Sequence, residues 1–476
     1  MISRRNLIKL GVGAAGAYAL RPPVAYAQTK AVSTVGGRPP VSQRKFTSEA
    51  VERVVAEVKH ELGETKLARL FENCFPNTLD TTVRHGTLDG KPDTFVITGD
   101  IPAMWLRDSS AQVWPYIPLA KEDLKLRALL AGVIHRQARS INIDPYANAF
   151  NFDREGGEWQ SDETQMRPEL HERKWEIDSL CYPVRLAHGY WKTFSDSSVF
   201  DDQWRNAARA IVKTFFEQQR KNSPGPYSFR RKTTTPNDTL NLNGYGNPIK
   251  PIGLIASGFR PSDDACICPF LIPSNLFAVR SLNQLNEIAT SVYRDAQLAS
   301  DCERLASEVA AAIEKYGTAQ HPEFGKVYAY EVDGFGNHLF MDDANVPSLL
   351  SLPYLGVCDI EDPVYLNTRR LVLSDANPYF FRGKAAQAIG GPHIGMDMVW
   401  PLAIIIRGMT SGDPAEIVSC LKTLVMTDAD AAFMHESFHK DDPTRFTREW
   451  FAWANTLFGE FVLKVRQENP QLLTSI

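Results

Sequence analysis

The sequence predicts an all-α fold in which paired helices form a ring and long polar loops gather at one end of it. Apolar residues recur at helical spacing in several segments, whereas the alternating patterns typical of long strands are nearly absent. The segments between the helices are long and rich in Pro, Gly, Asn and Asp. Because long loops without secondary structure are unusual unless they are functional, we expect these loops to carry the site.

The clearest helix is expected over residues 48–62. Glu49 and Glu52 lie in its first turn, where carboxylates complement the helix dipole. Its apolar residues at helical spacing are Val51, Val54, Val55, Val58 and Leu62. The same spacing recurs in two further segments, through Trp204, Ala208, Ile211 and Phe215, and through Leu305, Val309, Ala312 and Ile313. These three segments are therefore predicted to be amphipathic helices.

Strand-like patterns are limited to residues 94–98 and 327–331, which we expect to be short strands or loop hairpins. The long connections are residues 144–170, 219–263, 333–347 and 374–397. No segment of linker composition divides the body of the chain. The sequence therefore predicts one domain over residues 47–476, preceded by a flexible, polar lead-in over residues 28–46.

The first 27 residues have the pattern of an export signal. Arg4 and Arg5 form a twin-arginine motif, a weakly apolar stretch follows over residues 10–20, and Ala25-Tyr26-Ala27 is typical of a cleavage site. A membrane anchor is the alternative, but a bilayer-spanning helix needs about 20 apolar residues. We therefore expect residues 1–27 to be a bacterial Tat-type signal peptide and the mature protein to be periplasmic or secreted.

Composition limits the kinds of partner. The chain has 476 residues, of which 43% are hydrophobic, enough for a large buried core. Removal of the four basic residues of the signal peptide takes the formal net charge from −4 to −8. A mildly acidic protein without a Lys/Arg block has no footprint for nucleic acid. We expect no nucleic-acid partner and no membrane association after signal cleavage, while the oligomeric state is left open.

The cysteines do not indicate a metal or redox site. There are seven, an odd number, and Cys266 and Cys268 are the one close pair. Their spacing is not that of a zinc ribbon, so buried packing is the expected role. No stretch has the regular acidic spacing of a calcium-binding EF loop. No regular metal-binding spacing is therefore present and no cofactor is expected, while a metal held by scattered ligands stays open on these patterns alone.

The run Thr98–Ser110 has the composition of a sugar pocket. Arg107, Asp100 and Asp108 can hold adjacent hydroxyls in bidentate fashion, and the Trp105 indole offers a flat apolar face to a pyranose. The alternative is that Arg107 and Asp108 form a structural ion pair at a helix end.

This run, TGDIPAMWLRDSSAQVWPY, resembles the signature of glycoside hydrolase family 125, the exo-acting α-1,6-mannosidases. Three further runs match in order: GFRPSDDA at 258–265, MDDANVPSLLSLPYLG at 341–356 and HESFHKDDPTRFTREWFAWANTLFGE at 435–460. The resemblance extends from about Val51 to about Leu463. It implies an (α/α)6 barrel, or helical toroid, and metal-independent, inverting hydrolysis of terminal α-1,6-linked mannose in mannan or N-glycan-type oligosaccharides.

Hydrolysis of a glycosidic bond needs a carboxylic acid and a second carboxylate. The family resemblance puts the general acid on Pro261-Ser262-Asp263-Asp264, where Asp263 is favoured and Asp264 is the second choice, otherwise a substrate contact. The alternative is that the two aspartates cap the following helix. By the same resemblance Glu436 is the general base.

Glu436 lies between His435 and His439, and this crowding of polar groups indicates a pocket in which a water can be held against a base. The spacing is not that of a His-Glu-x-x-His zinc helix. We expect His439 to contact substrate.

Other polar residues are candidate substrate contacts, with turn formation as the alternative for each. They are Asp342, Asp343 and Asn345 in the third run, Met166, Glu176, Asp178 and Tyr182 around KWEIDSLCYP, and His393 in a glycine-rich turn over 390–395. We expect that turn to let backbone approach a ligand closely.

Other functions stay open. A glucoamylase-like or trehalase-like inverting glycosidase would use the same toroid and differ in the hydroxyls that it accepts. A polysaccharide lyase would need a basic groove, which the net charge does not favour. A glycan-binding protein would not need Asp263 and Glu436.

Overall fold

The computed structural model describes residues 37–154 and 156–476. The predicted signal peptide over residues 1–27 lies outside them. The helices of the described residues are α1 (Glu49–Leu62), α2 (Lys66–Cys74), α3 (Leu106–Val113), α4 (Leu124–Ile143), α5 (Ile177–Phe194), α6 (Asp202–Gln218), α7 (Asn241–Gly244), α8 (Ile272–Ile288), α9 (Ala296–Tyr316), α10 (Pro363–Val372), α11 (Pro401–Met409), α12 (Pro414–Met426) and α13 (Ala452–Glu468). The all-α prediction is confirmed.

Short antiparallel strands are confined to small sheets between the helices. The hairpins are β1 (Val83–Leu88) with β2 (Lys91–Val96), β7 (Thr318–His321) with β8 (Gly325–Tyr328), and β11 (Phe380–Arg382) with β12 (Gln387–Ile389). The three-stranded sheets are β3 (Met104–Trp105), β4 (Ala149–Phe150) and β5 (Leu170–Glu172); β10 (His338–Leu339), β9 (Glu331–Val332) and β6 (Phe270–Leu271); and β13 (Met398–Val399), β14 (Ser437–His439) and β15 (Asp442–Thr447).

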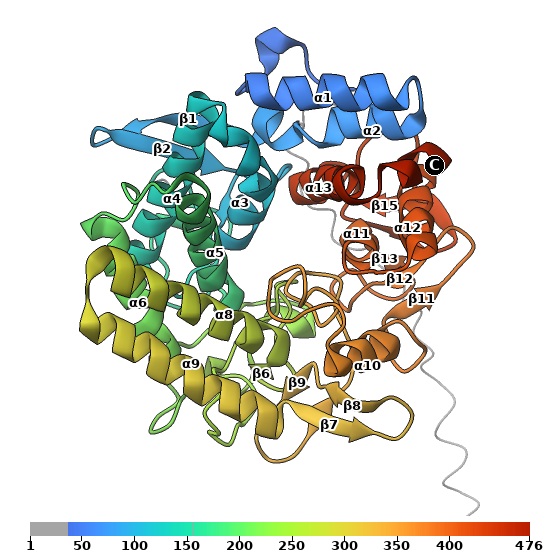
Figure 1. Cartoon of the computed structure of the whole chain (residues 1–476). Helices are drawn as coiled ribbons and strands as arrows, with labels where there is room; N and C mark the ends of the chain where they lie inside the picture. The colour runs from blue at the N-terminus through green and yellow to red at the C-terminus, as the bar shows by residue number, and fades with distance from the viewer. Residues whose placement is uncertain (1–36, 155) are drawn as a thin grey trace, which may run out of the picture. The chain divides into compact units, whose positions relative to one another are not determined.

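The helices form a ring of inner and outer layers (Figure 1). In the inner layer, α3 packs against α5, α5 against α8, α11 against α13, and α13 against α3. The outer helices α4, α6, α9 and α12 pack against one another or against an inner helix. Helix α13 also contacts α2, so the C-terminal helix closes the ring onto the N-terminal part of the chain. The predicted ring of paired helices is thus what the described residues form.

The three helices expected from apolar spacing correspond to α1, α6 and α9. Helix α1 begins after Ser48, whose hydroxyl accepts a hydrogen bond from the Val51 amide at 3.2 Å and donates one to Asp123 at 2.6 Å. The two expected strand segments correspond to β2 and β8. Periodicity therefore located the solvent-facing outer helices correctly.

The end of the expected flexible lead-in differs from the prediction. Arg38 lies on the folded body, where its guanidinium pairs with Glu52 at 2.6 Å and with Asp80 at 2.8 Å. A paired and mostly buried arginine fixes the chain before α1 begins.

The inner and outer helices begin differently. The first turns of α1, α4, α6, α9, α10 and α12 are capped by the side chains of Ser48, Asp123, Asp201, Asp295, Asp362 and Asp413. The inner helices α3, α5, α8, α11 and α13 follow extended residues and have no side-chain cap. The first amides of α3, α8 and α13 donate instead to carbonyl oxygens of other segments, those of Asn148, Tyr330 and Thr98. These ends carry the positive pole of the helix dipole.

No helix in residues 37–154 and 156–476 combines the length and apolarity that crossing a membrane requires.

The contact between α11 and α13 depends on a glycine. A Cβ added to Gly408 would lie 2.2 Å from the Phe461 ring, in a fully buried interface. We expect Gly408→Ala to destabilise the fold by about 1–3 kcal/mol through overpacking, although alanine favours a helix by about 0.5–1 kcal/mol over glycine. Denaturant unfolding measures this effect. Gly86→Ala, where an added Cβ meets no atom within 4 Å, should be within about 0.5 kcal/mol of the natural protein. Equal stability of Gly408→Ala and the natural protein would contradict this account.

Candidate active site

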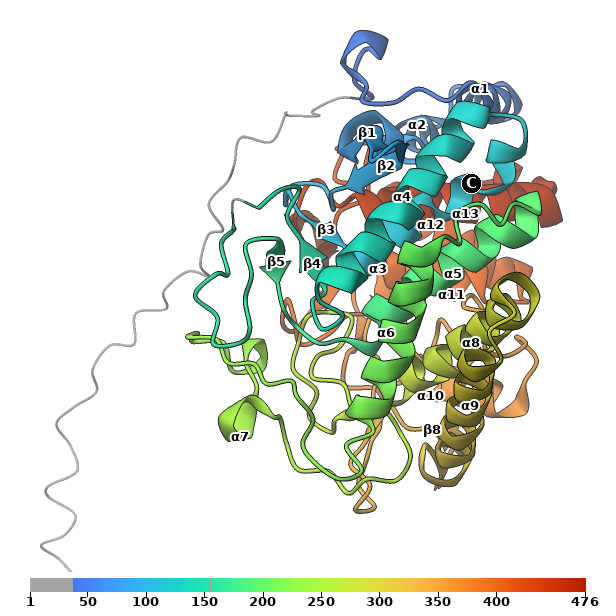
Figure 2. The same ribbon diagram turned by 90° about the vertical axis from the view of Figure 1, so that its left-hand side faces the viewer.

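The predicted site motifs lie at the N-terminal ends of inner helices and in the loops that precede them. The loops with β3, β4, β5 and α7 lie on one side of the helices in Figure 2. Strand β3 leads directly into α3. It pairs with β4, which in turn pairs with β5, and this sheet places Arg107 beside the segment that begins α5. On the other side of the ring, pairing of β13 with β14 places Glu436 beside the residues that begin α11.

Arg107 lies at the centre of a buried acidic cluster. Its guanidinium contacts Glu176 at 2.6 Å, Asp178 at 3.2 Å, Asp108 at 3.5 Å and Asp263 at 3.7 Å. Arg107 is 3% exposed. The structure thus shows the alternative in which Arg107 forms a structural ion pair, with four carboxyl groups in place of Asp108 alone. Contact of Arg107 or Asp108 with substrate stays a prediction.

The excess of carboxyl groups over arginine in the cluster goes with raised pKa values of three of these carboxyl groups. Burial raises the pKa of Asp108 to about 6, against the opposing effect of Arg107. Burial also raises the pKa of Glu176 and of Asp178 above the usual range for carboxyl groups. One guanidinium therefore does not hold all its carboxylate neighbours in the charged form.

Asp263 is the most exposed member of the cluster. Its side chain is 25% exposed, whereas that of Asp264 is 5% exposed. Asn148 donates a hydrogen bond to the Asp263 carboxylate at 3.2 Å, and Lys174 donates one to the backbone carbonyl of Asp263 at 2.9 Å. The backbone of Asp263 is left-handed, with φ of 67°, a conformation that non-glycine residues adopt mainly where the surroundings impose it.

The alternative that Asp263 and Asp264 cap α8 is wrong. Helix α8 begins at Ile272, its N-cap is Leu271, and no side chain caps it. The loop before it is held instead by the buried pair of Arg260 and Glu331, 2.6 Å apart.

Asp264 faces His393, whose Nδ1 lies 3.0 Å from its carboxylate. Burial alone would lower the pKa of His393, but the Asp264 carboxylate outweighs this effect and raises the pKa to about 9. Asp263 and Glu436 also act on the His393 charge. The imidazolium therefore links the two predicted catalytic carboxylates electrostatically.

The glycine-rich turn before His393 differs in part from expectation. A Cβ added to Gly390 would lie 2.0 Å from the Met398 carbonyl oxygen, and one added to Gly391 would lie 3.2 Å from Asp343. These two glycines allow the backbone to approach neighbouring segments of the protein closely.

Glu436 is held by two neighbours from the following hairpin. Its oxygens accept hydrogen bonds from the Thr447 hydroxyl at 2.9 Å and from Arg448 Nη1 at 3.2 Å. The other edge of the Arg448 guanidinium donates to Asp100, at 2.8 Å from Nε and 2.5 Å from Nη2. Arg448 thus joins the predicted base to the first sequence run.

The two histidines beside Glu436 do not form the polar crowd that the sequence indicated. His435 is buried, stacks on Phe446 with ring centroids 3.7 Å apart, and has its pKa lowered to about 4 by burial. His439 accepts a hydrogen bond from the Asp441 amide at 3.2 Å. His435 precedes β14, and its stacking on Phe446 of β15 places it in the interior.

The remaining predicted contacts are more deeply placed. Trp105 is 7% exposed, packs edge-on against His171, and its Nε1 has no hydrogen-bond partner within residues 37–154 and 156–476. Both carboxylate oxygens of Asp342 accept backbone amides, from Leu349 at 2.8 Å and Leu350 at 3.0 Å, which is the turn-forming alternative.

Asp343 and Asn345 likewise hydrogen-bond to each other. The Asn345 amide donates to Asp343 at 3.1 Å, and Ser262 donates to the other oxygen of Asp343 at 3.0 Å. These contacts tie the third sequence run to the loop of Asp263.

Four residues that position the site were missed in the sequence: Asn148, Lys174, Thr447 and Arg448. Thr447 and Arg448 lie within the fourth family-like run, and that position was their one available signal. Asn148 and Lys174 act through a loop distant in sequence, which no local pattern reveals.

No group of three or more His, Cys, Asp or Glu side chains that could hold a metal ion occurs in residues 37–154 and 156–476. All seven cysteines are free thiols, and Cys266 is buried, in agreement with a packing role.

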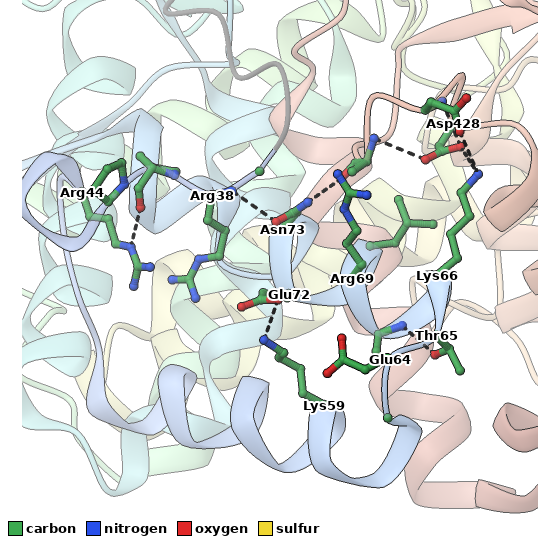
Figure 3. Close-up of a pocket in the computed structure, with 18 of the residues that line it drawn as sticks. Arg38, Arg44, Lys59, Glu64, Thr65, Lys66, Arg69, Glu72, Asn73 and Asp428 are labelled. Carbon is green, nitrogen blue, oxygen red and sulfur yellow. Dashed lines mark hydrogen bonds and ion pairs between the residues drawn. The ribbon is translucent and has the colours of Figure 1, made fainter.

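A separate cavity of about 980 Å³ lies between α1, α2 and the loop over 428–432 (Figure 3). None of the predicted site residues lines it. Its charged side chains pair with one another, as Lys59 does with Glu72 at 2.8 Å and Lys66 with Asp428 at 2.6 Å.

Comparison with known proteins identifies the family. The model of the metal-independent α-mannosidases, glycoside hydrolase family 125, matches residues 64–463. The chain belongs to this family. A Streptococcus pneumoniae member of the metal-independent α-mannosidases, solved as a non-productive substrate complex with α-1,6-mannobiose, is 43% identical, and the match covers 89% of this chain and 100% of that chain with a TM-score of 0.85. The ring of helices is accordingly an (α/α)6 toroid.

Other relatives extend this picture. The meiotically up-regulated gene 157 protein of Schizosaccharomyces pombe is 44% identical over 455 residues, 92% of this chain and 89% of that protein. A glucoamylase from Saccharomycopsis fibuligera is 12% identical with a TM-score of 0.51, over 91% of this chain and 99% of that one, and shares the fold.

His393 makes stability depend on pH. Because its folded-state pKa of about 9 lies above the ordinary value of 6.5, protonated His393 stabilises the fold below pH 6.5, and this contribution is lost as the pH rises to 9. We expect the free energy of unfolding of the natural protein, relative to His393→Gln, to fall between these pH values. In an Asp264→Asn background the fall should disappear. A difference that is constant with pH in the natural background would refute the ion pair.

Proposed function

We propose that the protein is an inverting exo-α-1,6-mannosidase in which Asp263 is the general acid and Glu436 is the general base. The observation that carries this proposal is the contrast between the two carboxyl groups. Asp263 is the most exposed carboxyl group of a buried acidic cluster around Arg107, whereas Glu436 accepts hydrogen bonds from Thr447 and Arg448.

The proposed reaction needs one proton donor and one proton acceptor on opposite faces of the sugar. Asp263 protonates the glycosidic oxygen as the bond to the anomeric carbon breaks. Glu436 takes a proton from a water molecule, whose oxygen attacks that carbon from the other side. Arg448 fixes the orientation of Glu436, because the arginine is itself held by Asp100.

The substrate is proposed to be a terminal α-1,6-linked mannose of mannan or an N-glycan-type oligosaccharide. Support comes from the Streptococcus pneumoniae relative, which was solved with α-1,6-mannobiose. The glucoamylase-like alternative has support from the shared fold alone, at 12% identity. Asp100, Trp105, Asp264, Asn345, His393 and His439 are proposed as substrate contacts.

We also propose that the protein is exported to the periplasm or the medium by the twin-arginine pathway, on the pattern of residues 1–27. Replacement of Arg4 and Arg5 by lysine should leave the protein in the cytoplasmic fraction of a bacterial host; unchanged export would oppose the proposal.

Substrate and stereochemistry can be tested in one assay. Inversion requires the carboxyl groups of Asp263 and Glu436 to lie about 6.5–9.5 Å apart, leaving room for a water molecule. We expect hydrolysis of α-1,6-mannobiose, but not of its α-1,2 and α-1,3 isomers, and initial release of β-mannose by proton NMR. First appearance of α-mannose would exclude inversion, and preferential cleavage of an α-glucoside would favour the glucoamylase-like alternative.

The two catalytic roles predict different mutant behaviour. Asp263→Asn and Glu436→Gln should each lower turnover by about 10²–10⁴-fold, because each change removes a proton-transfer group without altering size. An aryl mannoside with a good leaving group should rescue Asp263→Asn more than Glu436→Gln. Glu449→Gln, the same change at an exposed position of the same run, is the matched control and should retain full turnover.

The choice between the adjacent aspartates is tested separately. Near-normal turnover of Asp263→Asn together with loss of turnover in Asp264→Asn would transfer the acid role to Asp264.

A further inference from the structure

The carboxyl group of Asp263 is held by a buried amide, the side chain of Asn148. Asn148 is 0% exposed, and its Nδ2 donates to Asp263 Oδ1 at 3.2 Å and to Glu172 Oε2 at 2.8 Å. Arg107 Nη2 approaches the same Asp263 oxygen, Oδ1, at 3.7 Å. Both contacts therefore lie on Oδ1, and they leave Oδ2 for another partner.

The orientation of the Asn148 amide is fixed from its other side. Its Oδ1 accepts a hydrogen bond from the backbone N–H of Lys174 at 3.1 Å. A rotation that exchanged Oδ1 and Nδ2 would set a donor against this N–H group. It would also set an amide oxygen against the carboxyl groups of Glu172 and Asp263. Asn148 therefore presents a hydrogen-bond donor to Asp263.

The backbone of Asp263 is held by the same segment. Lys174 Nζ donates to the Asp263 carbonyl oxygen at 2.9 Å and to Asp238 at 2.7 Å. The Asp263 amide donates to the Arg260 carbonyl oxygen at 2.9 Å. These bonds hold Asp263 at a φ of 67°, which a non-glycine residue retains where its surroundings impose it. Lys174 thus fixes Asp263 through its ammonium group and Asn148 through its amide.

We propose that Asn148 is a positioning residue for the general acid: it holds Asp263 through Oδ1, so that Oδ2 carries the proton for the glycosidic oxygen. A protonated carboxyl group has one accepting carbonyl oxygen and one donating hydroxyl. A donor on Oδ1 makes Oδ1 the accepting oxygen and leaves the hydroxyl on Oδ2. This inference rests on the proposed function of Asp263. Asn148 is fully buried and acts through Asp263, without contact to the sugar.

The step moves one proton and one electron pair. The Oδ2–H bond of Asp263 breaks as the proton binds to the glycosidic oxygen. That oxygen keeps the electron pair of its broken bond to the anomeric carbon. Asp263 is left as a carboxylate whose Oδ1 keeps the contacts with Asn148 and Arg107, and uptake of a proton from solvent restores the acid.

Asn148 is the neighbour of Asp263 whose removal separates position from charge. Burial raises the pKa of Asp263, but the charges of Arg107 and Lys174 outweigh burial and lower this pKa. Loss of either cation would therefore change the ionisation of the acid as well as its position. Asn148 is neutral, so its loss changes mainly the position of the carboxyl group.

The first test compares two leaving groups in Asn148→Ala. Cleavage of α-1,6-mannobiose needs protonation of the glycosidic oxygen, whereas an aryl mannoside with a good leaving group needs little help from an acid. We expect kcat for α-1,6-mannobiose to fall by about 10- to 100-fold, since misplacement of a reacting group by about 1 Å can cost about 100-fold. KM, and kcat for the aryl mannoside, should stay close to those of the natural protein. Equal losses of kcat on both substrates, or no loss on either, would overturn the proposal.

Asn151→Ala is the matched control. Asn151 lies in the same loop, and its Nδ2 donates to the carbonyl oxygens of Pro168 at 3.0 Å and Leu170 at 3.1 Å. The control should retain the kcat of the natural protein on both substrates. A loss on α-1,6-mannobiose as large as that of Asn148→Ala would show that any buried amide of this loop has the same effect, and would overturn the proposal.

A double variant tests whether Asn148 acts through Asp263. In an Asp263→Asn background the acid is already absent, so Asn148→Ala should lower kcat for α-1,6-mannobiose no further. The two losses are then not additive, as expected for residues that act as a unit. A further loss equal to that in the natural background would show that Asn148 acts elsewhere, and would overturn the proposal.

A crystal structure can identify the reacting oxygen without any substitution, which keeps the proposal testable if Asn148→Ala does not fold. The ligand is α-1,6-mannobiose with sulfur in place of the linking oxygen, bound to the natural protein. We expect the sulfur to lie nearer to Asp263 Oδ2 than to Oδ1, with Asn148 still bonded to Oδ1. A sulfur nearer to Oδ1, or an Asn148 turned away from Asp263, would overturn the proposal.

These outcomes separate the inference from the proposed function. If the natural protein hydrolyses no α-mannoside, the proposed function fails. If it hydrolyses α-1,6-mannobiose and Asp263→Asn loses this activity, but Asn148→Ala lowers kcat equally for both leaving groups, the inference alone fails.

Discussion

The contact between Arg107 and the surrounding carboxyl groups is the interaction on which the rest of the site depends. It joins the first turn of α3, the start of α5 and the loop before α8, three segments that are far apart in the sequence. Breaking a buried pair of this kind by removing one partner leaves an uncompensated charge and costs about 3–5 kcal/mol. The cluster is therefore a fold-stabilising element, and the surrounding helices hold its carboxyl groups together.

Arg448 has the corresponding role on the opposite side of the ring. It spans from Asp100 near the start of the chain to Glu436 near its end, beside the helix α13 that packs on α2 and α3. The Glu436 carboxylate is thus positioned by the same contacts that close the toroid. Against the effect of burial, both arginines, Arg107 and Arg448, act to lower the pKa of Asp108, and both predicted catalytic carboxylates act to raise the pKa of His393. The groups around Arg107 and those around Arg448 therefore interact electrostatically.

The sequence could predict the outer helices and the motifs, but not the inner helices or the partners. Helices α1, α6 and α9 have one face in solvent and hence a periodic pattern. All eight residues of α3 are buried although most are polar, and α11 is apolar almost throughout, so neither shows the pattern of a helix with one face in solvent. The roles of Asp263 and Glu436 came from family-like runs. Arg448 was missed because its partner Asp100 is distant in sequence. His435 was misplaced because its burial comes from stacking on Phe446, a contact between two segments that local pattern does not reveal.

The uncapped starts of the inner helices give the toroid a polarity of its own. Four of them begin at the site, as Glu176 and Arg107 show for α5 and α3, and as Trp400 beside His393 and Phe451 beneath Arg448 show for α11 and α13. Their backbone amides favour negative charge whatever side chains are present. The starts of these four helices therefore contribute positive potential to the site independently of the side chains around them.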